Sequence, residues 1–393
     1  MTAASANPTP SADPVPVPSP DSVSPLAPPL PHFFADLYSF KWSEFGFRLP
    51  LVSATAVAVC LFTGILAGHP GGGLLAGGGA FTIGFGANQR IADSRLIPMI
   101  AAVFATSIAT LFGTLAGHHS YWLVIAAGVS AAICGFLTVR DTGLSWVGQQ
   151  ASIAMLVASA YPTGPKSAFI RAGLIAAGGV VQVLFTTAGL RMMPNLRKDL
   201  YSMASSVYHK VYDQERALVR HIREFPQSLP SISRSASIVY AIRLVITMCI
   251  ATEVDRHLGI QSGYWIPMTA LLVQKPAFFD TLTRSTLRIL GTLTGAWLGS
   301  LLIAHFVPSP VVLGAMTAVF ALLAFATNSV NYGLYSACLT AYIVFLLSLN
   351  QIPGPVIAHR RAWCTVVGGL IALVIHLDAL RRHRIAPSHP ASA

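Results

Sequence analysis

The chain has 393 residues, of which 54% are hydrophobic and only 10% are charged, and its formal net charge is +11. A soluble domain carries about 25% charged residues, so this composition excludes an ordinary soluble protein and indicates an integral membrane protein. The 25 basic residues are spread over many short segments, which argues against a nucleic-acid-binding patch and is typical of residues that set membrane orientation.

The segment 1–40 is expected to form a disordered tail, because its Pro-, Ser- and Ala-rich beginning has no apolar run that could bury a core. Beyond the tail, the sequence falls into apolar runs close to the ~20 residues that a helix needs to cross a bilayer. The predicted spans of the first half lie near 49–67, 71–87, 97–117, 121–139, 144–161 and 167–190. Those of the second half lie near 238–256, 262–276, 287–306, 310–327, 332–350 and 359–378.

The two halves are joined by a polar stretch, residues 191–236, in which apolar residues recur at helical spacing among basic ones. We expect a cytoplasmic amphipathic connector that packs under the membrane domain, or alternatively binds lipid or a partner. The predicted organisation is therefore a first repeat at 41–190, the connector, a second repeat at 237–380 and a basic tail at 381–393.

The halves resemble each other when each position of the first is aligned with the position numbered 190 higher in the second. Asp141 then falls on Asn331, and the pair Gly178 and Gly179 falls on Gly368 and Gly369; over the forty ungapped pairs from 141 to 180, twelve are identical. Asp141 and Asn331 are expected to cap the helices that follow them. Six helices per repeat is an even number, so the sequence predicts an all-α membrane protein of two six-helix repeats with the same topology.

The distribution of lysine and arginine along the chain indicates how the protein is oriented in the membrane. With both termini and the connector in the cytoplasm, twenty of these residues lie inside and five outside. Such a bias is the positive-inside pattern of membrane proteins.

One helix in the second half combines charges with small residues. Asp280, Arg284 and Arg288 have i, i+4, i+8 spacing, which places them on one helical face. The stripe Gly291, Gly295 and Gly299 follows, along which another helix is expected to pack closely. The arginines either anchor the cytoplasmic end of the helix or bind anions at the inner mouth of a pathway.

This part of the chain also resembles a known family. The matching residues are Tyr264, Trp265, Pro267, Pro276, Thr281, Arg284, Arg288, Gly291, Thr292 and Gly295. Together they resemble the signature of the fusaric acid resistance family, which is similar to bacterial aromatic acid exporters and more remotely to plant malate transporters. The resemblance implies proton-driven efflux of small organic, often aromatic, acids across the bacterial inner membrane. A periplasmic adaptor subunit and a homo-oligomer are further partners consistent with it, besides the acid substrate and the lipid bilayer.

Arg171 and Arg361 occupy equivalent places in the two halves, near the outer start of the last helix of each repeat. Charge within the membrane is costly and by default indicates function. The two arginines either bind a substrate carboxylate in a shared pathway, together with Arg284 and Arg288, or extend to the outer headgroups. The candidate proton carriers are Asp280, Glu253 and Asp255.

The sequence has no metal-ligand spacing, no phosphate-binding loop and no nucleophile–base motif, so we expect neither a cofactor nor an enzyme. The five cysteines lie in apolar runs and are expected to be buried. Besides the proton-coupled exporter, two alternatives remain from the sequence: a passive organic-anion channel and a non-transporting membrane scaffold.

Overall fold

The computed structural model of the chain describes residues 39–91, 94–118, 120–191, 236–305, 309–350 and 352–385. In these ranges the regular structure is helical, apart from one isolated bridge between Ile91 and Ser94. Within the same ranges, seven helices are long and apolar enough to cross a membrane. The predicted all-α membrane fold is therefore confirmed.

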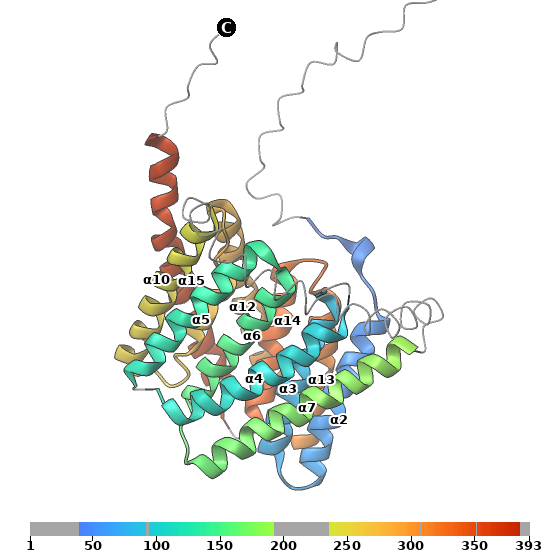
Figure 1. Cartoon of the computed structure of the whole chain (residues 1–393). Helices are drawn as coiled ribbons and strands as arrows, with labels where there is room; N and C mark the ends of the chain where they lie inside the picture. The colour runs from blue at the N-terminus through green and yellow to red at the C-terminus, as the bar shows by residue number, and fades with distance from the viewer. Residues whose placement is uncertain are drawn as a thin grey trace, which may run out of the picture.

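Each predicted span overlaps one α-helix (Figure 1). Before the connector these are α2 (Arg48–Leu66), α3 (Pro70–Gly84), α4 (Leu96–Ala116), α5 (Tyr121–Arg140), α6 (Thr142–Ser159) and α7 (Pro165–Arg191). After it they are α10 (Ala236–Leu258), α11 (Trp265–Val273), α12 (Phe278–His305), α13 (Pro310–Thr327), α14 (Tyr332–Ser348) and α15 (Gly354–Ile385). Two short 3₁₀ helices, η2 (Trp42–Glu44) and η3 (Phe85–Asn88), complete the described helices.

Two predicted boundaries were wrong. The span at 262–276 is a helix of only nine residues, because turns occupy both ends of that apolar run. The span at 287–306 begins instead at Phe278, so the charged residues before 287 belong to α12 itself. Most of the predicted tails, residues 1–38 and 386–393, and residues 192–235 of the connector lie outside the described residues, whereas 381–385 continue α15.

Side chains define several helix ends. Asp141 Oδ1 accepts a hydrogen bond from the Leu144 amide at 2.9 Å, and Asn331 Oδ1 accepts one from the Leu334 amide at 3.2 Å. The two predicted caps are thus confirmed at equivalent positions. Gly117, with φ at +69°, ends α4 in a conformation that favours glycine.

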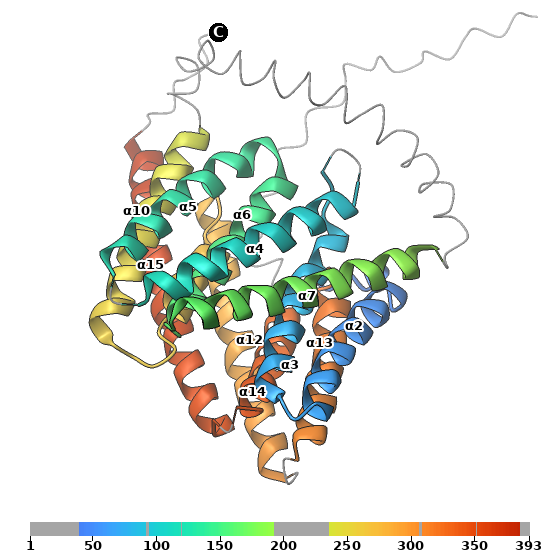
Figure 2. The ribbon, with the colours of Figure 1, turned by 60° about the horizontal axis from the view of Figure 1, so that its bottom comes forward.

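Corresponding helices have corresponding neighbours in the two halves. In the first half α4 packs on α6 and α7, α3 on α7 and α2, α2 on α7, and α5 on α6. In the second half α12 packs on α14 and α15, α11 on α15 and α10, α10 on α15, and α13 on α14. The halves meet where α5 lies beside α10 and α2 lies beside α13 (Figures 1 and 2).

Glycines permit the closest of these helix contacts. A Cβ atom added to Gly178 would collide with the carbonyl oxygen of Ala76, and one added to Gly368 with that of Ile266. The two contacts are equivalent in the alignment of the halves, since Gly178 falls on Gly368 and Ala76 falls on Ile266.

The glycine stripe of α12 packs as predicted. A Cβ atom at Gly291 or Gly295 would collide with the backbone of α14, while one at Gly299 would lie 3.3 Å from Val344. Close backbone approach of this kind is how small residues hold membrane helices together.

Candidate functional site

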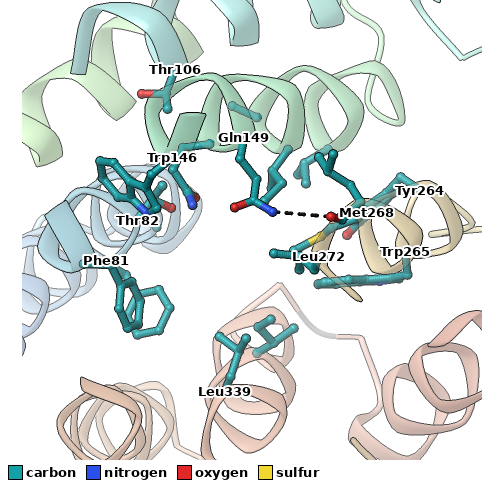
Figure 3. Close-up of a pocket in the computed structure, with 18 of the residues that line it drawn as sticks. Phe81, Thr82, Thr106, Trp146, Gln149, Tyr264, Trp265, Met268, Leu272 and Leu339 are labelled. Carbon is teal, nitrogen blue, oxygen red and sulfur yellow. Dashed lines mark hydrogen bonds between the residues drawn. The ribbon is translucent and has the colours of Figure 1, made fainter. Parts of the chain in front are cut away.

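A cavity of about 820 Å³ lies between the two halves. Phe81 of α3, Trp146 and Gln149 of α6, Trp265 of α11 and Leu339 of α14 surround it (Figure 3). Pockets of ~300–1,000 Å³ with mostly apolar walls are typical sites for small organic molecules.

The two shortest of the twelve described α-helices both line this cavity. α3 has 15 residues and α11 has nine, fewer than the ~20 that cross a bilayer. They occupy the second place in each half, and α3 provides Phe81 while α11 provides Trp265. Interrupted helices at corresponding places are a common feature of substrate sites in transporters.

Aromatic rings form much of the wall. The ring of Phe81 stacks on that of Tyr342, with centroids 3.9 Å apart, and the rings of Tyr264 and Trp265 lie 4.9 Å apart. Gln149 crosses the cavity edge and donates through Nε2 to a backbone carbonyl of α11 at 3.4 Å (Figure 3). The site thus offers flat apolar faces with a few polar groups between them.

Arg361 lies behind the wall formed by Trp265. Its guanidinium carbon is 4.0 Å from the centre of the Trp265 ring, and its Nε donates to Thr340 Oγ1 at 3.1 Å. The side chain is fully buried, and both terminal nitrogens, Nη1 and Nη2, have no hydrogen-bond partner. Arg361 therefore contacts the cavity through the tryptophan that lines it.

Arg288 lies close enough to Arg361 for their charges to repel. It is 1% exposed, and its Nε and Nη1 atoms have no hydrogen-bond partner. The cavity-lining Tyr335 lies within electrostatic range of both guanidiniums. Among the described residues no carboxylate pairs with either arginine. Two adjacent buried cations without a counter-charge are costly, and a bound anion would offset that cost.

One end of the cavity carries a second basic group. Arg284 lies over the ring of Tyr332 at 4.2 Å, and both residues line the cavity with Lys275. Lys275 lies in the linker between α11 and α12, where burial and then the Arg284 charge lower its pKa to about 8. The neighbouring Gln274 is fully buried, and its amide oxygen and nitrogen have no hydrogen-bond partner.

The other end of the cavity carries Arg171. Its guanidinium donates to the Tyr161 carbonyl, and both residues line the cavity. In the alignment of the halves, Leu75 stands where Trp265 does, and Pro98 where Arg288 does. The first half therefore lacks both the aromatic cover and the second arginine that surround Arg361.

The three predicted proton carriers have different surroundings. Asp280 is exposed in the first turn of α12. Glu253 is 38% exposed and pairs with Arg256 and His257. Asp255 is fully buried, and neither of its carboxylate oxygens has a hydrogen-bond partner.

The family signature serves the cavity and the packing around it. Tyr264 and Trp265 line the cavity, while Pro267 is buried in the first turn of α11. Pro276 lies exposed in the α11–α12 linker. On α12, Gly291 and Gly295 contact α14 and Thr292 is fully buried.

A buried polar network beside Lys275 was not predicted. Arg243 Nη1 lies 2.7 Å from His376 Nε2, and His376 Nδ1 lies 3.0 Å from Thr281 Oγ1. Thr281 Oγ1 in turn accepts from the Lys275 amide at 2.9 Å. The network ties α10, α15 and α12 to the linker; a histidine in the middle of an apolar run was its only signal in the sequence.

Within the described residues, no group of three or more His, Cys, Asp or Glu side chains is placed to hold a metal ion. The cysteines are buried apart from Cys249, which is half-buried.

Comparison with known proteins identifies the segment that contributes α11, α12 and α14 to this site. Residues 246–375 match the family model described as fusaric acid resistance protein-like. This segment is similar to that family. The resemblance seen in the sequence from Tyr264 to Gly295 is therefore confirmed, and the fusaric acid resistance-like segment includes Arg288, Trp265 and Arg361.

Curated relatives match over a similar length. The chain is 32% identical over 138 residues to the inner membrane protein YccS of Escherichia coli K12, which covers 35% of this chain and 19% of YccS. It is 33% identical over 140 residues to the uncharacterized transporter YdhK of the same strain, covering 34% of this chain and 21% of YdhK. An uncharacterized protein, ORF2, of Neisseria gonorrhoeae is 29% identical over 138 residues, which is 34% of this chain and 32% of ORF2.

The match therefore spans about a fifth to a third of the length of these relatives. Their names describe an inner membrane protein, a transporter and an uncharacterized protein. No solved structure is significantly similar to the chain.

Proposed function

We propose that the protein is an inner-membrane exporter of small aromatic acids that exchanges the acid anion for protons. The observation that carries this proposal is the buried pair Arg288 and Arg361, whose unpartnered nitrogens lie beside an aromatic cavity. A carboxylate accepts hydrogen bonds from guanidinium groups in a planar, paired geometry, and an aromatic ring fits between stacked side chains.

The arrangement of the helices supports a transporter. Matching neighbours in the two halves, and glycine contacts at equivalent positions, favour two six-helix repeats around a shared cavity. The relatives named as a transporter and as an inner membrane protein favour the same role and location.

The polar ends of the cavity suggest how the acid would pass. In the orientation that lysine and arginine favour, the Arg284 and Lys275 end faces the cytoplasm and the Arg171 end faces outward. An anion would be attracted at the first end, held near Arg288 and Arg361, and released past Arg171.

Flux through reconstituted vesicles tests this function. Purified protein in lipid vesicles is loaded with radiolabelled benzoate, and efflux is followed with and without an inwardly directed proton gradient. We expect efflux of benzoate to be faster than from protein-free vesicles and to be accelerated by the proton gradient, whereas the protein should not accelerate efflux of the neutral isostere benzamide.

The same assay separates the alternatives. A rate of benzoate efflux that is the same with and without the proton gradient would indicate a passive anion channel. Efflux no faster than from protein-free vesicles would contradict a transport role and favour a scaffold.

A further inference from the structure

Asp255 is the only fully buried carboxyl group among the described residues. It lies near the end of α10, and Thr252, one turn earlier, is also fully buried with no partner for its hydroxyl. Removing an ionised carboxylate from water costs several kcal/mol unless a proton or a counter-charge accompanies it. Asp255 must therefore hold a proton or share one.

The partner for that proton comes from the other half of the chain. His118, in the loop between α4 and α5, places Nε2 3.6 Å from Asp255 Oδ1, and its side chain is 15% exposed. A carboxylic acid beside a neutral imidazole and a carboxylate beside an imidazolium contain the same single proton. Because Asp255 is fully buried, the first form is favoured, in which the carboxyl group holds the proton, and His118 gives the pair contact with water.

Further ionisable groups lie on the elements around Asp255. The Cys364 thiol of α15 lies within electrostatic range of both Asp255 and Arg361. On α10 itself, Arg256 pairs with Glu253 and stacks over the ring of Tyr121.

One short segment covers both Asp255 and Arg361. Gly263 lies directly on the carboxyl group, so closely that a Cβ atom there would collide with Oδ1. Two residues later, Trp265 lies over the Arg361 guanidinium. The turn between α10 and α11 is tight, with positive φ at Gly259 and Ser262. A change of charge under Gly263 would therefore act on a segment that also covers the anion site.

We propose that Asp255 and His118 form a proton-binding site that controls whether Trp265 covers Arg361. With the proton bound, the carboxyl group is neutral and the Gly263–Trp265 segment lies on it, as in the structure. When the proton leaves through His118 to water, the bare carboxylate draws water under Gly263, and the segment lifts away from Arg361. No other bond changes in this step.

The proposal rests on the proposed function and explains why transport would run outward. Proton and anion binding exclude each other, because the proton-bound form covers the arginine that the anion needs. Protons taken up on the outer side would therefore expel the acid there, which is the sign that proton-driven export requires.

The proton site is tested first without any substrate. Infrared spectra of the purified protein should show the C=O band of a buried carboxylic acid at about pH 5 that is lost by about pH 7.5, where histidines and buried carboxyls titrate. Asp255→Asn should remove the band, while Glu253→Gln, the partly exposed acid two residues away, should keep it. Absence of the band in the wild type, or its persistence in Asp255→Asn, would overturn the site.

Movement of the segment is tested by labelling. In Ser262→Cys, reaction of the new thiol with a water-soluble maleimide should rise between about pH 5 and pH 7.5 beyond the intrinsic rise measured on a free thiol. Asp255→Asn, which mimics the protonated form, should abolish the additional rise. The parent protein provides the background from the native cysteines. Equal reactivity with and without Asp255→Asn would contradict control of the segment.

Binding of benzoate, which stays ionised between about pH 5 and pH 7.5, tests whether loss of Asp255 weakens or strengthens anion binding. Asp255→Asn should weaken benzoate binding about 5- to 150-fold at about pH 7.5, the usual size of coupling between sites. If Asp255 acted only as a nearby negative charge, its removal would strengthen anion binding instead, and that result would overturn the proposal. If the wild type binds no benzoate while the infrared and labelling results hold, the proposed substrate is wrong and the proton site remains.

Discussion

The guanidinium of Arg361 lies over the indole ring of Trp265, 4.0 Å from its centre, so that the aromatic wall of the cavity also covers a buried cation whose Nη1 and Nη2 atoms have no hydrogen-bond partner. Arg361 comes from α15 and Trp265 from α11. A cation over a tryptophan face contributes ~0.5–2 kcal/mol. This contact orients the guanidinium where no carboxylate pairs with it among the described residues.

Replacing the ring tests the value of that contact. In the proton-bound form at about pH 5, Trp265→Leu removes the ring that covers Arg361 and should strengthen benzoate binding about tenfold, since 1.4 kcal/mol is a factor of ten, and Trp265→Phe should strengthen it less. The matched control is Trp146→Leu, which removes a ring of the same size from the α6 wall, on the side of the cavity opposite Trp265. Weaker benzoate binding in both Trp265→Leu and Trp146→Leu, measured by calorimetry, would mean that only the aromatic surface matters.

Gly295 tests the packing of α12 on α14. Gly295→Ala places a methyl group against the Ala337 backbone and should destabilise the protein by ~1–3 kcal/mol. Gly173→Ala is the control, because nothing lies within 4 Å of the added carbon, and it should be neutral or stabilising. Thermal unfolding in detergent compares the two; equal melting temperatures would show that α12 does not depend on this contact.

Lys275 should give benzoate binding a decline at alkaline pH. Its pKa is lowered to about 8, so the ammonium is charged below that pH and neutral above it. Affinity for the anion should therefore fall as pH rises through about 8. Lys275→Gln should have lower affinity without this decline, while any increase between about pH 5 and pH 7.5 should remain. A decline that persists unchanged in Lys275→Gln would assign it to another group.

The orientation is tested by labelling two serines that lie between helices. In the proposed topology Ser120 faces outward and Ser329 faces the cytoplasm. Cysteines introduced at these sites should react with an impermeant maleimide in intact cells at Ser120 only. Reaction at Ser329 alone would invert the orientation, and with it the direction of export.

The sequence located most helices because hydropathy and length define a membrane span almost without tertiary information. It failed at α12, where polar residues before 287 lower the mean hydropathy although Thr281, Thr283 and Ser285 are buried against other helices. It also overestimated α11, since an apolar run does not reveal where the backbone turns.

For the site, the internal repeat and the family signature drew attention to Arg361 and Arg288 separately. Neither indicated that these two cations lie together, because they are far apart along the chain and meet only through packing of α12 on α15. The contact of His376 with Arg243 was missed for the same reason, since 133 residues separate them.

The central claim is that Arg288 and Arg361 hold the carboxylate of the substrate. A charge-assisted hydrogen bond contributes ~1.5–3 kcal/mol, so losing one arginine should weaken binding about ten- to a hundredfold. Arg361→Lys keeps the charge but not the planar fork, and should recover only part of the loss.

The most direct measurement is calorimetric titration of benzoate into folded wild type, Arg288→Gln, Arg361→Gln and Arg361→Lys at about pH 7.5, below the pH at which Lys275 loses its charge. Benzamide serves as the neutral control ligand. The account predicts that wild type binds benzoate most tightly, Arg361→Lys with intermediate affinity and both glutamine variants most weakly. The affinity for benzamide should be the same in all four proteins. Wild-type affinity for benzoate in both glutamine variants would contradict it.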